Sequence, residues 1–121
     1  MAENHKMITD LLGIKHPIIV APMFLVSNEA MVIAAIENGC TAAIPALNYR
    51  TSDELRKGIR TIKEKANGPM GINLIANKSN FRLQKDLQIC LEEGVDFYIT
   101  SLGKPDEASK PEFSLDFGLT K

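Results

Sequence analysis

The fold of this chain follows from its first apolar run, Pro17-Ile18-Ile19-Val20-Ala21-Pro22-Met23. The run is rich in β-branched residues, is bounded by prolines and is too short to be a helix. Strands that are buried on both faces have this continuous apolar character, because helices cover both sides of a parallel sheet. Residues 17–23 are therefore predicted to form a buried strand of an α/β protein.

Three further runs of the same kind follow, at residues 41–47, 70–76 and 95–100. The segments between them carry apolar residues at helical spacing, so strands and helices alternate with a repeat of about 26 residues. Right-handed crossovers make the strands of such a repeat parallel. A short helix is also expected at residues 7–12, where it would cap the end of the sheet.

Each crossover helix has recognisable ends. Ser27 is expected to cap the first helix, which should stop near Gly39. Thr51 and Glu54 predict a capping box at the start of the second helix, whose basic residues are expected to face water. Gly94 should close the third helix. The positions expected to pack on the sheet are Ala30, Ile33, Ala34 and Ile36 in the first helix, Leu55, Ile59, Ile62 and Ala66 in the second, and Leu83, Leu87 and either Cys90 or Leu91 in the third.

Composition excludes several classes of protein. The 121 residues carry 14 basic and 15 acidic side chains, and no stretch of Lys and Arg is dense enough for a nucleic-acid surface. The longest nearly uncharged stretch, residues 17–35, is interrupted by polar residues and is not expected to span a membrane. The polar N-terminus lacks the apolar core of a secretory signal, so a cytoplasmic protein is expected.

Cysteine and histidine provide no sign of a metal site or a thiol enzyme. Cys40 and Cys90 lie about fifty residues apart in apolar surroundings, as expected for two reduced thiols. No Cys or His spacing matches a metal site. His16 precedes the first strand, at the end away from the expected chemistry, and His5 lies near the terminus.

Four βα-type strands fit two architectures. One is an open, doubly wound sheet that is complete in itself, and the other is half of a (β/α)₈ barrel, which usually needs ~250 residues. The regular pattern stops after Gly103, so residues 1–103 are expected to form the domain and residues 104–121 an irregular tail. In that tail, Phe113 and Phe117 are candidate anchors to an apolar surface.

In both architectures, ligands bind beyond the carboxyl ends of the strands. The residues at those ends are mostly neutral and apolar, with a few amides and hydroxyls. They include neither the paired carboxylates of a glycosidase nor the Cys/His pair of a thiol enzyme. A flat apolar ligand with a hydrogen-bonding edge, such as the isoalloxazine ring of a flavin, suits this rim.

Residues 11–23 resemble the opening of the nitronate monooxygenase family, formerly called 2-nitropropane dioxygenases. The segments 39–45, 71–74 and 99–105 then fall in the order and at the spacing that this family shows. The resemblance covers residues 7–105 and implies a TIM barrel that holds FMN without a covalent link. It therefore implies that this chain is the N-terminal half of a (β/α)₈ barrel, with residues 1–103 as a partial FMN-binding domain.

The resemblance also implies the residues that bind the cofactor. The backbone around Ala21, Pro22 and Met23 is expected to lie against the flavin ring, and the Asn73 amide to bond to the cofactor. A carboxamide suits a ring edge because it offers both a donor and an acceptor. The alternative for Asn73 is an amide that caps the loop after the strand.

Four residues at the strand ends have two possible roles each. Met23 and Phe24 are either walls of the flavin site or core residues. Ser101 and Gly103 either border the pocket or form a turn that requires glycine.

The function implied by the resemblance is FMN-dependent oxidation of alkyl nitronates with O₂, here in a truncated form. The alternatives are an enzyme like the flavin-dependent enoyl-acyl carrier protein reductases and a non-catalytic α/β fragment. In the family, a catalytic histidine and the loops that grip the FMN phosphate lie beyond the fourth strand, and no residue of this chain matches them. The isolated chain is therefore expected to bind FMN weakly or not at all, and its open sheet edges favour a homodimer.

Overall fold

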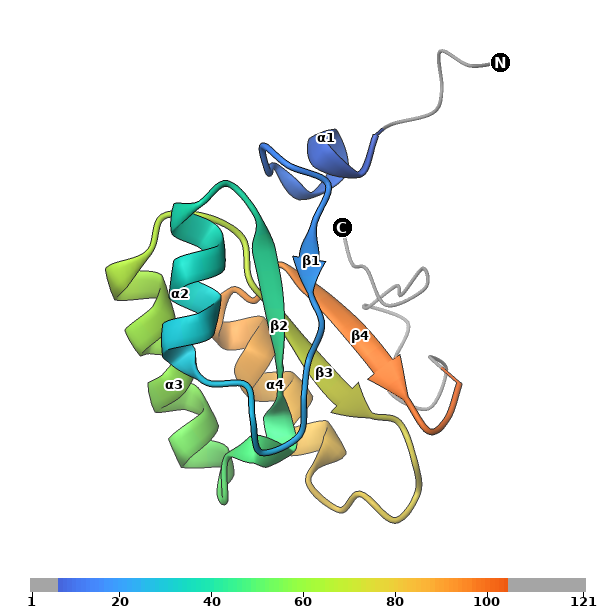
Figure 1. Ribbon diagram of the computed structural model, residues 1–121. Helices are drawn as coiled ribbons and strands as arrows, with labels where there is room; N and C mark the ends of the chain where they lie inside the picture. Colours follow the sequence, from blue (N-terminus) through green and yellow to red (C-terminus); the bar gives the residue numbers. More distant parts are fainter. Residues whose placement is uncertain (1–6, 105–121) are drawn as a thin grey trace.

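The computed structural model describes residues 7–104, in which four parallel strands alternate with helices (Figure 1). The strands lie side by side in the order β1-β2-β3-β4, so each new strand is added next to the one before it. The predicted α/β organisation is confirmed. Of the expected tail, all but Lys104 lies outside the described residues. The elements are α1 (Ile8–Leu12), β1 (Ile19–Val20), α2 (Glu29–Glu37), β2 (Thr41–Pro45), the 3-10 helix η2 (Ala46–Asn48), α3 (Ser52–Lys65), β3 (Gly71–Ile75), α4 (Leu83–Glu93) and β4 (Phe97–Ser101).

The register of the strands aligns residues from three of them at one level of the sheet. Pro45 of β2 pairs with Asn73 of β3, and Asn73 pairs with Ile99 of β4. Because all the strands run the same way, their carboxyl ends meet at one edge of the sheet (Figure 1). The segments that follow the strands are thereby brought together.

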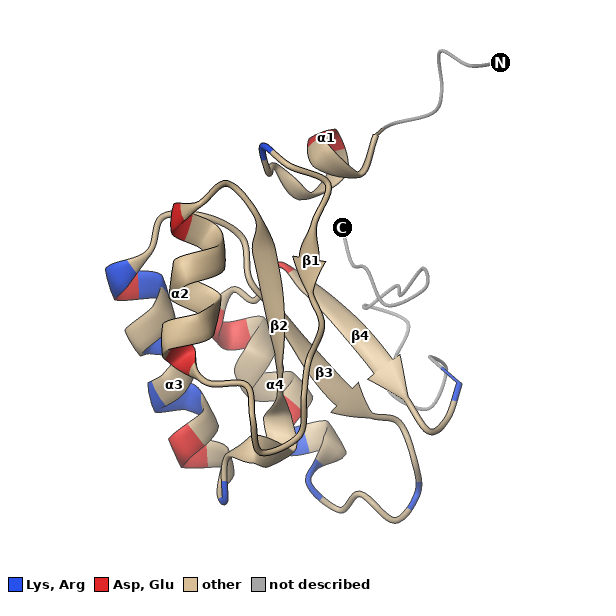
Figure 2. Ribbon diagram, viewed as in Figure 1, with Lys and Arg blue, Asp and Glu red and all other residues tan. Residues whose placement is uncertain are grey.

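The main core lies between the sheet and helices α2, α3 and α4. None of the four strands carries a charged residue, while the helices carry Lys, Arg, Asp and Glu on their outer faces (Figure 2). Burial of this apolar layer is the principal stabilising contribution to the fold. Its fully buried members include Ile44, Ile72 and Leu74 from the strands and Leu55, Ile59 and Ile62 from α3.

A second cluster covers the opposite face of the sheet near the start of the strands. Leu12 and Ile14, at and just after α1, pack there with Ala43 and Phe97. Ala43 alternates along β2 with residues of the main core, so it points to the other face. The prediction that the first short helix caps the end of the sheet is confirmed.

The first strand is much shorter than predicted. Of residues 17–23, only Ile19 and Val20 pair with β2. Pro22 has no N–H to give to a ladder, and the Met23 N–H donates to the Ser27 hydroxyl at 2.7 Å instead. The chain therefore leaves the sheet after Val20 and turns toward α2.

For α2, the predicted capping residue was wrong, and so was part of the predicted buried face. Asn28, not Ser27, caps the helix, and its Oδ1 accepts the Met31 N–H at 2.9 Å. Of the four positions expected to pack on the sheet, Ile36 is buried and Ile33 packs partly buried against the main core, whereas Ala30 and Ala34 are exposed. The helix is apolar nearly all round, so its periodicity could not single out the buried side. The residues that are buried are Val32, Ala35 and Ile36.

Helix α3 matches its predicted apolar face, and half of its capping box forms. The Thr51 hydroxyl accepts the Glu54 N–H at 3.1 Å. The Glu54 carboxylate accepts the Arg50 N–H at 3.3 Å instead of that of Thr51, so the reciprocal bond reaches one residue further. The predicted buried positions Leu55, Ile59, Ile62 and Ala66 are all buried.

The basic residues of α3 do not simply face water, as was expected. Arg56 pairs with Glu92 and Glu93, and Arg60 also pairs with Glu93 at the end of α4. In addition, Lys63 pairs with Asp96 just before β4. These partners come from a later βα unit, so a helical wheel of α3 alone could not reveal them.

The structure shows which residue of α4 packs in the core and the state of the two cysteines. Cys90 is buried and Leu91 is 43% exposed, so Cys90 is the core position. Gly94 closes the helix in the left-handed conformation, as predicted. Both cysteines are free thiols, and none of the helices in residues 7–104 combines the length and apolar character of a membrane span.

Candidate functional site

A pocket of about 430 Å³ lies at the carboxyl ends of the strands. It brings Pro22, which follows β1, into one wall with Asn73 of β3, although fifty residues separate them in the sequence. The wall is almost entirely apolar, with the Asn73 amide as its polar side chain. The lining residues are Pro22, Phe24, Pro45, Leu47, Asn73, Ile75 and Leu102.

Asn73 is 8% exposed, and its carboxamide both bonds to the sheet and lines the pocket. Its Nδ2 donates to the Ile99 carbonyl at 2.9 Å and to the Ser101 hydroxyl at 2.8 Å, both on β4. Its Oδ1 accepts no hydrogen bond from residues 7–104 and is the group left for a ligand. Sequence reasoning expected a donor and an acceptor, but the structure leaves only the acceptor.

The three residues predicted around the end of β1 are not equivalent. Pro22 lines the pocket, whereas Ala21 and Met23 do not. The Met23 carbonyl accepts the N–H groups of Val26 and Ser27, so this part of the backbone is already engaged in a turn. That the backbone of residues 21–23 lies against a flavin ring stays a prediction, and Pro22 is the residue that the pocket supports.

The turn formed by residues 23–27, which we term the rim segment, is held by Asn48 of η2. The Asn48 Oδ1 accepts the Leu25 N–H at 2.7 Å. Its Nδ2 donates to the carbonyls of Met23 at 3.3 Å and Ser27 at 3.0 Å. Sequence reasoning placed Asn48 among the amides at the strand ends but gave it no role, because the partner segment precedes it by more than twenty residues.

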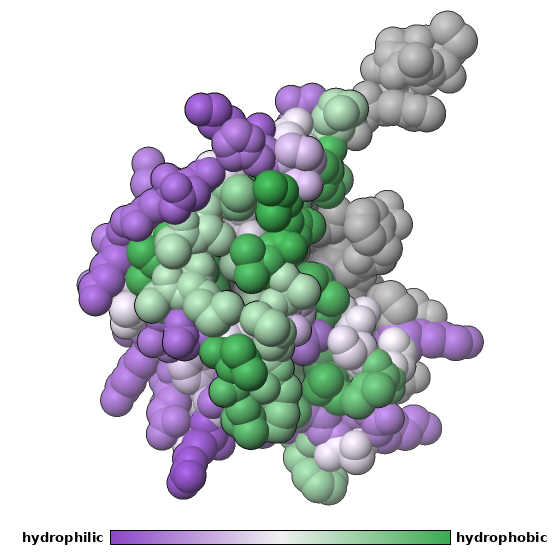
Figure 3. Space-filling view, viewed as in Figure 1, coloured by the Kyte–Doolittle hydropathy of each residue, from purple (hydrophilic) through white to green (hydrophobic). Residues whose placement is uncertain are grey.

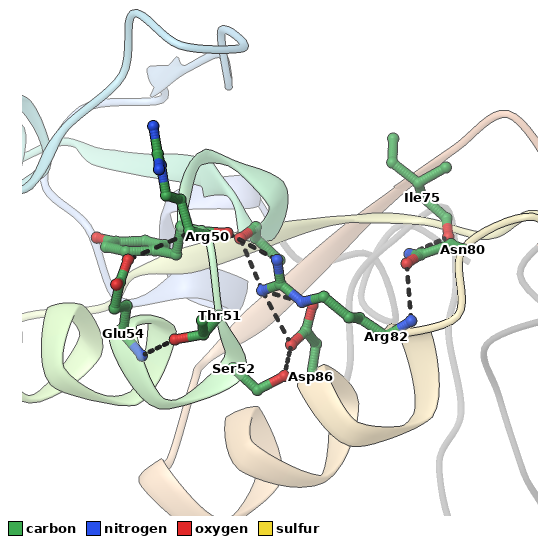
Figure 4. Close-up of polar contacts among 10 residues, drawn as sticks. Arg50, Thr51, Ser52, Glu54, Ile75, Asn80, Arg82 and Asp86 are labelled. Atoms are coloured by element: carbon green, nitrogen blue, oxygen red, sulfur yellow. Dashed lines mark hydrogen bonds and ion pairs between the residues drawn. The ribbon is translucent and has the colours of Figure 1, made fainter.

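Helix η2 is in turn held by the Arg82 guanidinium (Figure 4). Arg82 donates to the carbonyls of Ala46 at 3.5 Å and Tyr49 at 2.7 Å, the residues on either side of Leu47 and Asn48. It also pairs with Asp86, which is fully buried and accepts the Ser52 hydroxyl at 2.7 Å. Arg82, Asp86 and Ser52, which we term the Arg82 clamp, therefore join η2, the start of α3 and the start of α4.

Two further side chains fasten the segments beside the clamp. Asn80 donates to the Ile75 carbonyl at 2.9 Å and accepts the Arg82 N–H at 3.1 Å, so it shapes the loop from β3 to the clamp (Figure 4). The Tyr49 hydroxyl bonds to the Glu29 carboxylate in the first turn of α2. Burial, together with this carboxylate, raises the pKa of Tyr49 far above its usual range, so the phenol stays protonated.

Leu102 is placed in the pocket wall by an unusual backbone conformation after β4, where the chain passes close to Ala76. Leu102 adopts a positive φ of 59°, which is unusual for a residue other than glycine. At Gly103, a side chain would overlap the Ala76 carbonyl, so only glycine allows this approach. Neither Ser101 nor Gly103 lines this pocket: glycine is required at 103 by the close approach to Ala76, and Ser101 serves as a partner of Asn73.

The pocket contains no titratable side chain of its own. Cys90 lies in the main core, where burial raises the pKa of its thiol and keeps it protonated. Residues 7–104 hold no group of His, Cys, Asp and Glu that could bind a metal ion. The described residues can therefore bind and orient a ligand in this pocket, but they offer it no acid or base.

Comparisons with known proteins agree with this geometry. The family model described as nitronate monooxygenase matches residues 5–109. FabK from Thermotoga maritima, a TIM-barrel enzyme, is similar in structure, with 27% sequence identity and a TM-score of 0.78 over 88% of this chain. Its M276A mutant gives 28% identity and a TM-score of 0.75 over 86% of this chain. No curated protein sequence matches.

The chain spans only about a third of FabK, covering 33% of that chain and 34% of its mutant. The four parallel strands with alternating helices therefore correspond to part of a (β/α)₈ barrel, and the predicted fold class is confirmed. The match to the family model covers most of the sequence. This chain belongs to the nitronate monooxygenase family.

Proposed function

We propose that this chain supplies the ring-facing wall of the flavin site in an FMN-dependent oxidoreductase of the nitronate monooxygenase type. The observation that carries the proposal is the pocket that joins Pro22 and Asn73 at the carboxyl ends of the strands. Bound FMN would supply the redox chemistry, taking electrons from an alkyl nitronate and passing them to O₂. The residues of this chain bind and orient the ring.

The pocket fits the ring of a flavin better than its phosphate. Its volume of about 430 Å³ lies within the range of small-molecule sites, about 300–1,000 Å³. Pro22, Leu47 and Leu102 offer apolar surface to the faces of a ring, and the Asn73 Oδ1 offers an acceptor to an N–H on its edge. No Lys or Arg lines the pocket, so the phosphate gains no charge partner there and binding to this chain alone should be weak.

An enoyl-acyl carrier protein reductase is the second candidate function. It is favoured by the likeness to FabK, which belongs to that class of flavin-dependent enzyme. The two functions differ in the electron donor, because a reductase oxidises a nicotinamide and a nitronate monooxygenase consumes O₂ with its nitronate. Nicotinamide oxidation with an enoyl thioester and O₂ uptake with propane-2-nitronate, measured on the whole protein, therefore separate them.

The role of Asn73 provides a direct test with a matched control. Asn73→Leu keeps the branched shape of the side chain but removes the acceptor together with the donors to β4, whereas Ser101→Ala removes one partner of those donors and leaves the acceptor in place. The loss of one hydrogen bond to the ligand, worth about 0.5–1.5 kcal/mol, should weaken FMN binding roughly two- to twelvefold in Asn73→Leu. FMN titrations followed by NMR measure this for both variants.

Equal affinities in the two variants would contradict the assigned role of Asn73. The proposal requires weak but detectable binding, so it fails if neither variant nor the parent chain responds to FMN at millimolar concentration. The chain would then be better described as a non-catalytic α/β unit.

A further inference from the structure

The rim segment, residues 23–27, is an exposed apolar turn held by hydrogen bonds within the segment and by one side chain from outside it, Asn48. Phe24, Leu25 and Val26 are all exposed, so packing does not fix their positions. Figure 3 shows such apolar side chains gathered on the face of the molecule that carries β1 and α2. Asn48 bonds to three backbone groups of the segment, two carbonyls and one N–H.

The bond to Leu25 is the most informative of the three. Leu25 has a φ of 62°, a left-handed conformation that is unfavourable for a leucine. Its side chain is 73% exposed, so no burial compensates for this conformation. The Asn48 Oδ1 lies 2.7 Å from the Leu25 nitrogen and is the group outside the turn that bonds to this residue, beside the hydrogen bonds that close the turn itself.

The position of Asn48 links two walls of the pocket. Leu47, the preceding residue, lines the pocket directly, and the rim segment begins between Pro22 and Phe24, which line it from the β1 side. The Arg82 clamp holds the carbonyls on either side of the Leu47–Asn48 pair, so η2 is a fixed support. The bonds from Asn48 to the rim segment therefore connect the two walls.

We propose that Asn48 is the positioning residue of this pocket: its carboxamide holds the rim segment so that the Pro22–Phe24 wall and the Leu47 wall form a slot of fixed width. Asn48 acts through the rim segment and does not line the pocket itself. The identity of the ligand in the slot rests on the proposed function. The positioning by Asn48 rests only on the contacts within the chain.

Asn48→Ala tests the proposal, with Thr41→Val as the matched control. The buried Thr41 hydroxyl donates to the Pro69 carbonyl at 2.7 Å, so Thr41→Val also removes a side-chain bond to the backbone, but at the opposite end of β2. In Asn48→Ala, the Leu25 N–H should exchange with solvent at least tenfold faster, as measured by NMR. FMN should bind at least fivefold more weakly. Thr41→Val should change neither quantity, even where it lowers the stability of the fold.

A rescue separates positioning from a general loss of stability. Asparagine adopts the left-handed conformation more readily than leucine. Adding Leu25→Asn to Asn48→Ala should therefore recover at least half of the lost FMN affinity, since the segment then needs less support. A purely structural role of Asn48 predicts no such recovery.

The two proposals fail in distinguishable ways. Unchanged exchange of the Leu25 N–H in Asn48→Ala would overturn the role of Asn48, whatever the chain binds. An equal loss of FMN affinity in Thr41→Val would overturn it as well. If the parent chain shows no response to FMN, the proposed function fails, and the exchange of the Leu25 N–H still decides the role of Asn48.

Discussion

Asn73 and Asn48 mark how far single residues could be assigned from the sequence. Asn73 follows a strand signal directly, and parallel strands bring their ends together, so its place in the site was predictable. That both N–H groups of the Asn73 amide donate to β4 was not predictable, because these bonds depend on the register of Asn73 with Ile99. The role of Asn48 depends on the path of a turn far away in the sequence, and no local pattern encodes that path.

Gly71 is a residue at which close packing excludes any side chain. A methyl group there would overlap the ring of Phe97, which is fully buried on the α1 side of the sheet. Gly71→Ala should therefore lower the free energy of unfolding by about 1–3 kcal/mol, the usual cost of overpacking. Urea denaturation followed by circular dichroism measures it.

Phe97→Leu provides the control for this prediction, because it removes the ring that the methyl group would meet. The cost of Gly71→Ala should shrink when it is measured in the Phe97→Leu background. The same cost in both backgrounds would show that the ring is not the cause.

At the level of elements, the sequence predicted the apolar repeats well and their pairwise contacts poorly. The apolar face of α3 and the left-handed close of α4 at Gly94 are local properties, and both were correct. The buried face of α2 was only half correct, with Ile33 and Ile36 right and Ala30 and Ala34 wrong, because that helix is apolar on several sides. The ion pairs between α3 and α4 were missed because they arise only when two βα units pack together.

These ion pairs predict a dependence of stability on pH. The hydrogen bond from Gln88, and then that from Arg56, lower the pKa of Glu92, and the hydrogen bond from Arg60 does most to lower the pKa of Glu93. A carboxyl whose pKa is lower in the folded state stabilises the fold above its unfolded pKa of about 4.3. That contribution is lost as the pH falls through the lower, folded-state pKa.

Urea midpoints at about pH 6 and about pH 3.5 in low salt check this dependence. The parent chain should lose more stability between the two pH values than Glu93→Gln, which has no group to protonate at this position. Glu37→Gln is the control, since Glu37 is exposed and makes no ion pair with residues 7–104. If Glu93→Gln and the parent chain respond alike, the ion pairs contribute nothing to the acid sensitivity.

For the whole molecule, the four strands leave two edges that pair with no other described strand. β1 pairs only with β2 and β4 only with β3 among residues 7–104. Open edges without charged residues favour association with another chain. We therefore propose that the isolated chain forms a homodimer through these edges.

Light scattering after size-exclusion chromatography tests the homodimer. A mass near twice 13.3 kDa is expected, with a fraction of dimer that rises with protein concentration. A folded chain that stays at 13.3 kDa at every concentration would contradict the homodimer.

Whether the pocket at the strand ends holds the flavin ring is decided by a ¹⁵N NMR titration of the chain with FMN. We expect weak binding, with chemical-shift changes concentrated at Asn73, Ile75, Leu47 and Leu102 and no response of these residues to inorganic phosphate alone. Shifts that lie instead on the exposed faces of α3 and α4, or tight binding driven by the phosphate, would contradict this expectation.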